Sequence, residues 1–532
     1  MRKIILLSLL FSCFVPMDGS YYFYVQLKDK NNTNFSLSNP ASYLSQRAIE
    51  RRNYYNIPMD STDLPVNMQY IRQISDLGIH VHCTTKWLNG VTVLVKDTSV
   101  IASIRTLPFV QFTQYTGISN ENPVVPVAPS KIKTTDFDYG VAATQIDQMN
   151  GRIWHQNGFN GETIHIAVID AGFYGVNTNP AFQTLRDENR LLGTKDFVNP
   201  HSNIYVEDGH GALVLSTMAA EIDGTFVGTA PKASYWLLRT EAGIGEYLYE
   251  PDFWISGIEF ADSAGVDLAT TSLGYTEFDD PTMNYSYSQL DGKSIRASIA
   301  ADMAYQKGII LLNSAGNEGN KAWKYISVPA DAKGVITVGS VGADGLPSAF
   351  SSFGPSADNR IKPELCAIGS SSAFVTANGT TAYGNGTSFA TPILAGLTAC
   401  YLQAAKEKNP VHTLDELRNH LYQSAHLYTM PTNQMGYGIP DFSTVYDSLV
   451  KSSLLKLPAD NSRMAYKILI RDDQPLIFRI PTTDTNGLYT ASIYSVSGQL
   501  QAKIKVRNNT VTVHSSEFER GIYLLKFEKA SP

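Results

Sequence analysis

The chain has 532 residues, which is too long for one ordinary domain and predicts two to four domains. Hydrophobic residues make up 43% and charged residues 17%, a composition that excludes a disordered chain and indicates a globular protein with a large core. The formal net charge of −7 and the lack of a basic run argue against a partner bound through phosphates, so no nucleic acid is expected.

The N-terminus has the pattern of a secretory signal peptide. Two basic residues follow Met1, an apolar stretch comes next, and small residues follow it. We expect the signal to be residues 1–19, with cleavage near residues 17–20. A lipoprotein-type cleavage at Cys13 is the alternative, although the apolar stretch before it is short. No later segment reaches about 18 consecutive apolar residues, so no membrane span is expected.

Residues 20–115 alternate strand-like and helix-like segments. YYFYVQL and FVQFTQY are typical of strands, and a hairpin is expected around Asn89 and Gly90. The pattern predicts a small α+β unit of the split βαβ type. Residues 116–138 are rich in Pro, Ser and Asn and lack periodicity, which predicts a linker.

The cysteines do not predict a disulfide scaffold. His80 and His82, with Cys83 next to them, have the period-two spacing of a strand and no further ligand nearby, so ordinary strand residues are favoured over a metal site. Cys366 and Cys400 lie in one segment of the chain, and the sequence leaves open whether they pair.

From residue 139 to residue 448, short apolar strands alternate with helices. The strand TIHIAVID precedes the helix GALVLSTMAAEI, and the helix SIRASIAADMAYQKG precedes the strand IILLNSAG. This alternation predicts an α/β fold, a mostly parallel sheet with helices on both faces. Ligands of such sheets bind beyond the carboxyl ends of the strands. Residues 455–532 return to alternating strands with short turns and predict a small all-β domain.

Three polar residues occur where strands of the expected sheet end or helices begin. Asp170 ends TIHIAVID, His210 stands between two glycines at the start of a helix, and Asn317 follows IILLNSAG. Taken alone, each has an ordinary interpretation, as a turn aspartate, a solvent-facing loop histidine and a turn asparagine.

Ser388 lies in GNGTSFATPILAG, where a glycine-rich approach runs into an apolar helix. We expect Pro392 in the first helical turn, where backbone N–H groups have no intrahelical acceptor. Ser388 is then at or just before the helix N-terminus. An N-cap serine is the ordinary interpretation of such a residue.

Taken together, the four residues supply the parts of a nucleophilic site. A serine hydroxyl needs a base in contact to act near neutral pH, and the base needs a carboxylate that fixes its tautomer. The oxyanion formed on attack needs a donor already aimed at it. The Gly-x-Ser-x-Gly pentapeptide of α/β-hydrolases does not occur in this sequence.

The segments AVIDAG, GHGALV, SAGNEG and GTSFATPILAG closely resemble the active-site blocks of subtilisin-like serine proteases, in the same order along the chain. The resemblance implies that Asp170 orients His210 and that His210 is the general acid and base. It further implies that Ser388 is the nucleophile and that Asn317 lines the oxyanion hole.

The segment TSLGY is similar to the substrate-binding edge of that family. The resemblance implies that Ser272, Leu273 and Gly274 pair their backbone with an extended peptide, a mode in which main-chain hydrogen bonds bind any sequence. Tyr275 stands where the family often has a small residue, so the preference of the primary pocket stays open.

Two further departures concern residues without acid or base chemistry. Ala212 replaces the usual threonine after His-Gly, and Phe389 replaces the usual methionine after the serine. We expect activity to survive both changes, with Phe389 narrowing the packing near Ser388.

The flanking segments carry their own resemblances. Residues 20–115 stand where subtilisin-like zymogens carry an inhibitory propeptide, and the α+β pattern fits that role. In residues 455–532, YSVSGQL and GIYLLKF resemble the C-terminal sorting domains of proteins exported by the type IX secretion system. This second resemblance implies a Gram-negative bacterium of the Bacteroidetes type, with release from the cell or attachment to its surface.

These features predict a secreted serine endopeptidase that is made as a zymogen and acts on proteins or peptides. Its further partners would be its own propeptide, as an inhibitor, and the secretion machinery. The alternative is a catalytically silent surface adhesin or scaffold, and the four intact catalytic positions argue against it. No cofactor or catalytic metal is required; the family resemblance allows for structural calcium, whose ligands the sequence does not identify.

Overall fold

The computed structural model describes residues 19–119, 137–243, 245–408 and 413–455, followed by 464–470, 476–479, 489–495, 499–506, 510–513, 518 and 521–529. The chain divides into two compact units, Met1–Val445 and Tyr446–Pro532. The expected signal peptide lies outside the described residues except for Gly19, and so does Cys13.

The N-terminal part of the first unit is a four-stranded antiparallel sheet in the order β2-β3-β1-β4. Its strands are β1 (Ser20–Leu27), β2 (His80–Thr85), β3 (Gly90–Val95) and β4 (Val110–Ser119). Its helices are α1 (Gln46–Tyr54), α2 (Met68–Ser75) and α3 (Ile101–Arg105). The expected hairpin is present, with Asn89 at a φ of 54° before β3. Strand β4 continues four residues beyond the expected end at residue 115.

The period of two in β1 explains how this sheet buries both faces. Phe23, Val25 and Leu27 point into the core of the N-terminal sheet with the residues of β3. Tyr22, on the opposite face, belongs to the core of the large central sheet, so the small sheet packs against the rest of the unit.

The centre of the unit is a seven-stranded sheet in the order β13-β12-β11-β10-β5-β9-β6. Every neighbouring pair is parallel, which confirms the expected α/β fold class. The strands are β5 (His165–Asp170), β6 (Leu191–Asp196), β9 (Ser234–Arg239), β10 (Leu268–Thr271), β11 (Ile310–Ser314), β12 (Val335–Val341) and β13 (Leu365–Ile368). The two edge strands, β6 and β13, were not predicted from the sequence.

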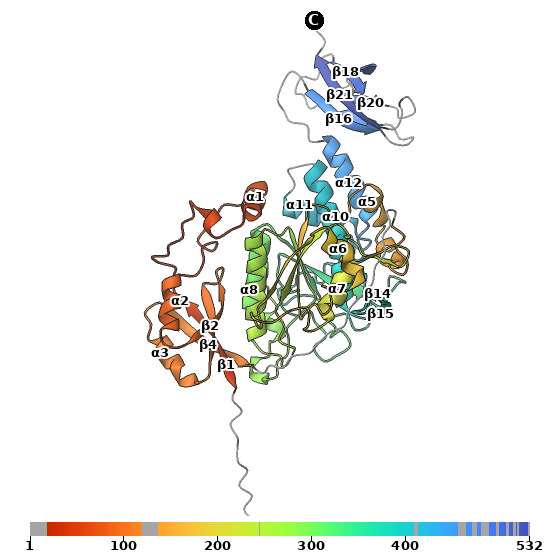
Figure 1. The fold of residues 1–532 in the computed structure, drawn as a ribbon. Helices are drawn as coiled ribbons and strands as arrows, with labels where there is room; N and C mark the ends of the chain where they lie inside the picture. Colours follow the sequence, from red (N-terminus) through yellow and green to blue (C-terminus); the bar gives the residue numbers. More distant parts are fainter. Residues whose placement is uncertain are drawn as a thin grey trace, which may run out of the picture. The chain divides into compact units, whose positions relative to one another are not determined.

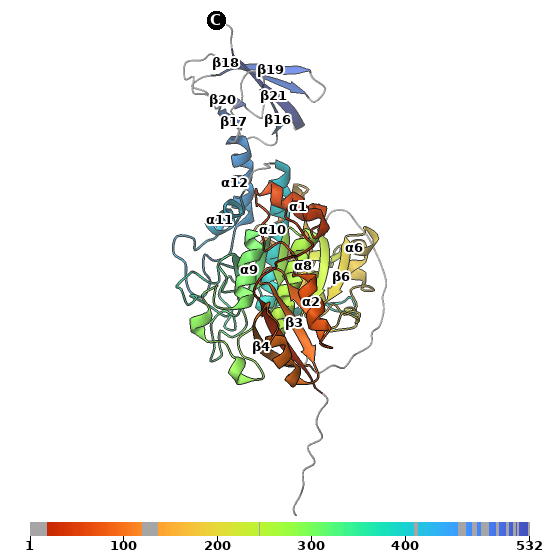
Figure 2. The same cartoon turned by 90° about the vertical axis from the view of Figure 1, so that its left-hand side faces the viewer.

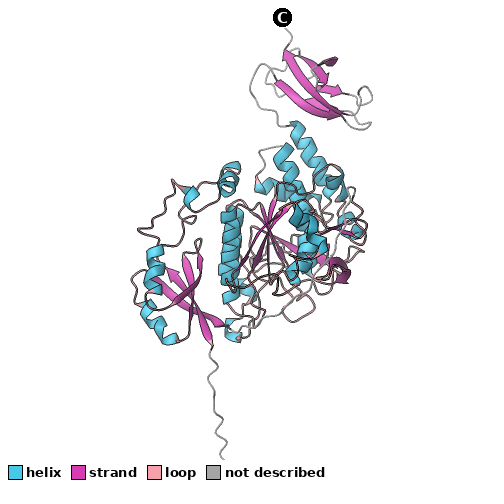
Figure 3. Cartoon of the chain, in the orientation of Figure 1, coloured by secondary structure: helices cyan, strands magenta, loops and turns pink. Residues whose placement is uncertain are grey.

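Helices cover both faces of the central sheet (Figures 1 and 3). Helix α8 (Tyr249–Ala264) packs on α9 (Arg296–Gln306), and α7 (His210–Ala219) packs on α10 (Thr387–Lys408). The remaining helices are α4 (Ala143–Asp147), α5 (Arg152–Gln156), α6 (Gln183–Asp187), α11 (Leu414–Ser424) and α12 (Phe442–Leu455). Two small ribbons complete the unit, β7 (Glu221–Ile222) with β8 (Phe226–Val227) and β14 (Ser372–Val375) with β15 (Thr381–Gly384).

Helix α8 is buried on two opposite sides. Ile255 and Ile258 are fully buried in the core of the central sheet, while β1 and β2 of the N-terminal sheet lie against the same helix (Figures 1 and 2). None of the described helices combines the length and the apolar character that a membrane crossing needs.

The second unit contains antiparallel strands, as the sequence predicts. One sheet has the order β16-β21-β18-β19, and β17 pairs with β20. The strands are β16 (Met464–Ile470), β17 (Leu476–Arg479), β18 (Tyr489–Ser495), β19 (Leu500–Lys505), β20 (Thr510–Val513) and β21 (Gly521–Lys529).

Cys366 and Cys400 are free thiols, and both are completely buried. Of the two histidines that precede Cys83, His80 is exposed, and His82 donates from Nε2 to the carbonyl of Phe197 at 2.8 Å with its ring against Phe253. The interpretation of this group as ordinary strand residues is therefore supported over a metal site.

We expect dithiothreitol to leave the thermal midpoint of the folded protein unchanged, because Cys366 and Cys400 are not bonded. Burial raises the pKa of Cys366 to about 12 and raises the pKa of Cys400 as well. Since the thiolate is the reactive form, neither thiol should react with Ellman's reagent before unfolding. A midpoint that falls on reduction would show a disulfide instead.

Candidate active site

The structure brings Asp170 and His210 together. Asp170 is the last residue of β5 and is fully buried, and His210 is the first residue of α7. The two side chains are joined by a hydrogen bond of 2.7 Å between His210 Nδ1 and Asp170 Oδ1. Because an ionised carboxylate only accepts hydrogen bonds, Nδ1 carries the proton and Nε2 is the basic nitrogen.

Gly211 allows this approach of the helix to the strand. A Cβ atom at residue 211 would lie 2.5 Å from the carbonyl oxygen of Gly172 and 2.9 Å from Cβ of Asp170. A larger residue would therefore push the start of α7 away from the end of β5. The glycine after the histidine is part of the site for this steric reason.

The carboxylate of Asp170 raises the pKa of His210 from its ordinary 6.5 to about 9, although burial acts in the opposite direction. The hydrogen bond to Asp170 contributes to the rise, as do the charges of Asp208 and Glu241. A negative charge beside an imidazole stabilises the protonated form, which is the form that a general base passes through.

Ser388 is the second residue of α10, so the expectation that it lies at a helix N-terminus is confirmed. The expectation that Pro392 lies in the first turn is wrong, because it is the sixth residue of the helix. A proline has no N–H to donate to the carbonyl four residues before it, which is that of Ser388. That carbonyl instead accepts a hydrogen bond of 2.9 Å from the hydroxyl of Ser272.

Ser272 ties the start of α10 to the edge of the central sheet. Thr271 is in register with Ile169, so Ser272 follows β10 beside the end of β5, where Asp170 lies. The Ser388 hydroxyl donates to the Ser272 carbonyl at 3.4 Å, and no hydrogen bond joins Ser388 to His210 among the described residues. Catalytic hydrogen bonds often tighten only when substrate is bound, so this arrangement is compatible with a serine nucleophile.

Asn317 lies three residues beyond the end of β11, the neighbour of β10. Its Oδ1 atom accepts hydrogen bonds from the backbone N–H of Thr387 at 2.9 Å and from the Thr387 hydroxyl at 3.0 Å. A backbone N–H can only donate, so the oxygen of the carboxamide faces Thr387. The Nδ2 group is thus turned away from Thr387, on a side chain that is exposed.

The three expected substrate-edge residues follow β10 directly. The carbonyl of Leu273 is already used, since it accepts a hydrogen bond of 3.0 Å from Nδ2 of Asn313. Gly274 is exposed, and neither its N–H nor its carbonyl has a partner among the described residues. A Cβ atom at Gly274 would lie 1.9 Å from Ser327 Oγ, which explains the glycine.

The residues that depart from the family pattern are all buried. Phe389 stacks on Phe374 with ring centroids 4.9 Å apart, and Ala212 is 2% exposed. Tyr275 is 1% exposed and donates its hydroxyl hydrogen bond to Glu241 at 2.6 Å. Tyr275 thus links the end of the substrate edge to Glu241.

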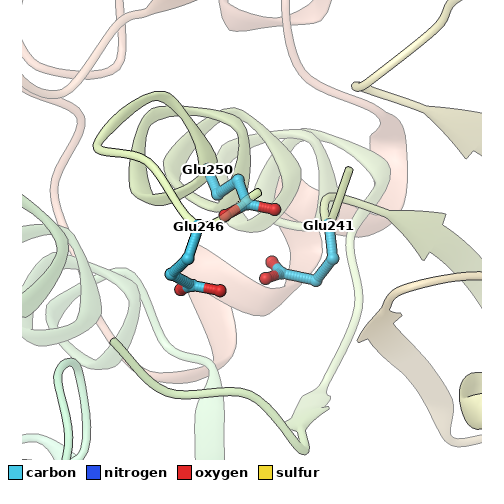
Figure 4. A group of neighbouring side chains, drawn as sticks. All are labelled: Glu241, Glu246 and Glu250. Carbon is cyan, nitrogen blue, oxygen red and sulfur yellow. The ribbon is translucent and has the colours of Figure 1, made fainter. Parts of the chain in front are cut away.

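Glu241 belongs to a cluster of three carboxylates with Glu246 and Glu250 (Figure 4). One oxygen from each lies within 4.8 Å of the others. Ca²⁺ takes six to eight oxygen ligands, and this group offers three side chains, of which Glu250 already accepts the N–H of Ala242 at 2.8 Å. The cluster therefore supports no calcium assignment, and structural calcium stays a prediction.

Sequence reasoning missed Glu241 and Thr387. Thr387 could have been found, because it stands directly before Ser388 and its N–H and hydroxyl orient Asn317. Glu241 gave no signal, since it follows β9 in a loop and only the folded chain brings it near His210 and Tyr275.

Comparison with known proteins identifies the family of the chain. Residues 161–438 match the model of the subtilase family, and residues 22–132 match the Bacteroidota propeptide domain of peptidase S8. Subtilisin NAT of Bacillus subtilis subsp. natto is 28% identical over 371 residues, which cover 69% of this chain and 82% of that protein. Subtilisin of Bacillus pumilus is 30% identical over 286 residues, 53% of this chain and 90% of that protein.

The chain belongs to the subtilase family. It is a subtilisin-like serine endopeptidase with an N-terminal propeptide domain.

We expect hydrolysis to rise with pH through a midpoint above 6.5. Only neutral His210 accepts a proton, and its raised pKa keeps it protonated to higher pH. Glu241→Gln removes one of the charges that raise this pKa, so the midpoint of the kcat/KM profile should move to lower pH. The exposed Glu277→Gln serves as the control, and an unshifted midpoint in E241Q would contradict the electrostatic role of Glu241.

Proposed function

We propose that the protein hydrolyses peptide bonds with a triad of Asp170, His210 and Ser388. The observation that carries this proposal is the 2.7 Å hydrogen bond from His210 to the buried Asp170 at the carboxyl edge of the sheet. Ser388 begins the helix that is tied to the same edge through Ser272.

The chemistry follows from these positions. His210 Nε2 takes the proton of the Ser388 hydroxyl while Oγ attacks the carbonyl carbon of the substrate, and a tetrahedral intermediate forms. The protonated imidazole then gives this proton to the leaving amine, and water hydrolyses the acyl-enzyme by the same steps in reverse order. Asp170 stays ionised throughout and stabilises the imidazolium.

Asn317 would stabilise the intermediate. Its oxygen is held by Thr387, which leaves the Nδ2 hydrogens for the oxyanion beside Ser388. The backbone N–H groups at the start of α10 add the positive end of a helix dipole. This arrangement would put donors where negative charge develops.

An extended peptide would bind along Ser272, Leu273 and Gly274. The unpartnered N–H and carbonyl of Gly274 can form a strand-like pair with substrate backbone. Such pairing recognises a main chain rather than one side chain, which suits protein and peptide substrates.

The precursor would be a zymogen exported from the cell. Its propeptide would act as the inhibitor, and the β-strands of the second unit would serve as the sorting domain for type IX secretion, with release outside the cell or attachment to its outer surface. The sequence pattern of residues 1–19 and of residues 455–532 supports export. A silent adhesin or scaffold is not favoured, because such a protein has no physical need for the bonded Asp170–His210 pair.

Labelling with a fluorophosphonate tests the proposal, because only an activated serine reacts. The mature wild-type protein should be labelled, and Ser388→Ala should lose both labelling and hydrolysis. Ser372→Ala removes a buried serine away from the proposed triad and provides a control for labelling. Labelling that persists in S388A would reject Ser388 as the nucleophile.

Asn317→Leu should lower kcat and leave KM nearly unchanged, because the amide acts on charge that exists only in the transition state. The expected size is that of subtilisin itself, in which loss of the oxyanion-hole asparagine costs about 10²–10³ in kcat. Steady-state kinetics on a chromogenic peptide measure both constants. A raised KM with normal kcat would make Asn317 a ground-state binding residue.

Residues 20–119, added in trans, should slow hydrolysis by the mature enzyme. The reason is that this segment covers α8, whose Glu259 accepts hydrogen bonds from the N–H groups of Lys86 at 2.7 Å and Trp87 at 3.0 Å. Progress curves at micromolar concentrations of the segment provide the measurement. Unchanged rates with a segment shown by circular dichroism to be folded would argue against the inhibitor role.

A further inference from the structure

The propeptide contacts helix α8 along its whole length. Near the N-terminal end, the ring of Tyr22 lies 4.7 Å from that of Tyr249, measured between centroids. Further along, Glu259 holds the residues after β2, and the backbone N–H of Ser45 donates to the carbonyl of Ser263 at 2.9 Å. Sixteen residues of α-helix span about 22 Å, so the two ends of this contact are well separated.

At the C-terminal end of α8, the propeptide presents three arginines from helix α1. Arg51 donates to the carboxylate of Asp262, to the backbone carbonyl of Val266, and to that of Lys307 at 3.2 Å. Arg52 forms ion pairs with Asp63 at 2.8 Å and with Asp262 at 2.9 Å. Arg47 donates to the carbonyl of Gly265 at 3.0 Å and pairs with Asp267. These three arginines with Asp262 and Asp267 are called the arginine anchor below.

Three charged groups of the anchor, Arg51, Arg52 and Asp262, are almost completely removed from water. Arg52 and Asp262 are 0% exposed, and Arg51 is 4% exposed. Burial alone would raise the pKa of Asp262, but the cations Lys86, Arg52 and Arg51 lower it below its ordinary value. Among the described residues, the ion-pair partners of Asp262 all come from the propeptide. Asp267, by contrast, keeps Lys406 of the protease.

The protease in turn supplies a cation that pairs with acidic residues of the propeptide. Lys307, the residue directly after α9, donates to Asp63 of the propeptide at 2.9 Å and to Asp60 at 3.1 Å. The arginines meet backbone carbonyls at the C-terminal ends of α8 and α9, where the helix dipoles favour positive charge. Charge and hydrogen-bond direction are thus complementary on both sides.

Lys30 joins the chain that follows helix α1 to the propeptide sheet. Its ammonium group donates to the backbone carbonyls of Ser61 at 2.7 Å, Leu64 at 2.6 Å and Lys86 at 2.7 Å. The first two carbonyls belong to the chain after α1, and the third follows β2. Lys30 therefore connects the chain that follows the arginines to the sheet that covers α8.

We propose that the arginine anchor retains the propeptide on the protease after the chain between them has been cut, and so sets how long the inhibitor stays bound. The proposal rests on the inhibitory role of the propeptide proposed above. It goes beyond that role because the anchor touches neither Ser388 nor the edge at Gly274. Truncating one partner of a buried, hydrogen-bonded charge pair acts mainly on the dissociation rate, because it leaves the other charge unpaired.

The test uses the full chain with Ser388→Ala and a recognition sequence for a site-specific protease inserted between residues 120 and 136. After cutting, dissociation of the labelled N-terminal piece is followed by size-exclusion chromatography on dilution. The parent piece should stay bound, and Arg51→Gln and Asp262→Asn should each raise the dissociation rate constant about 30-fold or more. Arg72→Gln, at an exposed arginine of α2 in the same propeptide, should change it less than about twofold.

The double variant with Arg51→Gln and Asp262→Asn separates a direct interaction from damage to either partner. The fold increase in its dissociation rate constant should be clearly below the product of the fold increases of the two single variants, since the second change removes a partner that is already lost. Circular dichroism of the uncut chains checks folding, and Arg47→Gln, at the more exposed end of the anchor, provides a milder variant. Its dissociation should also be faster than that of R72Q.

Dissociation rates of R51Q, D262N and R47Q equal to that of R72Q would overturn the proposal. The readout needs no hydrolysis by the chain itself, so it stands whether or not Ser388 is the nucleophile. In the same cut chain with Ser388 intact, the onset of hydrolysis should follow the dissociation of the piece. Onset before dissociation would reject the inhibitory role while leaving the retention result intact.

Discussion

The parallel register of three central strands is the constraint on which the site depends. Thr271 of β10 lies beside Ile169 of β5 and Asn313 of β11, so these strands end at one edge. Asp170 and Ser272 are the residues reached there, and Ser272 then fixes the first turn of α10 through the carbonyl that Pro392 leaves free. A change in the register of one of these strands would separate the carboxylate of Asp170 from Ser388, even with the local sequence unchanged.

Helix α8 couples this site to the propeptide. Its inner side packs on the central sheet, and its outer side carries Asp252, Glu259 and Asp262, which are all buried and all hydrogen-bonded to residues of the propeptide. Isolated carboxylates are costly to bury, so each needs donors from its cover. Glu259 and Asp262 obtain them from the propeptide itself. The propeptide is therefore part of the folded core of the precursor rather than a loosely attached segment.

The sequence predicts the local chemistry of the site better than its surroundings. Glycines beside His210 and before Ser388, and the strand-end position of Asp170, follow from short-range rules, and the structure has Asp170 at the end of β5 and Ser388 in the first turn of α10. The position of Pro392 was predicted wrongly, because its tolerance depends on the hydroxyl donor Ser272, which lies 116 residues before Ser388, the residue whose carbonyl it bonds. The acidic residues of α8 recur with the spacing that is typical of the solvent-exposed face of a helix. No local pattern shows that a second domain covers them.

The sequence by itself determined the alternation of strands and helices, the order of the four proposed catalytic positions and the α+β character of the propeptide. These features arise from periodicity and turn chemistry, which act over a few residues. The tertiary structure decided the two edge strands, the state of Cys366 and Cys400, and the partners of Arg51, Arg52 and Asp262. Those outcomes depend on which distant surfaces meet, and burial changes the energy of a charge or a thiol only after they have met.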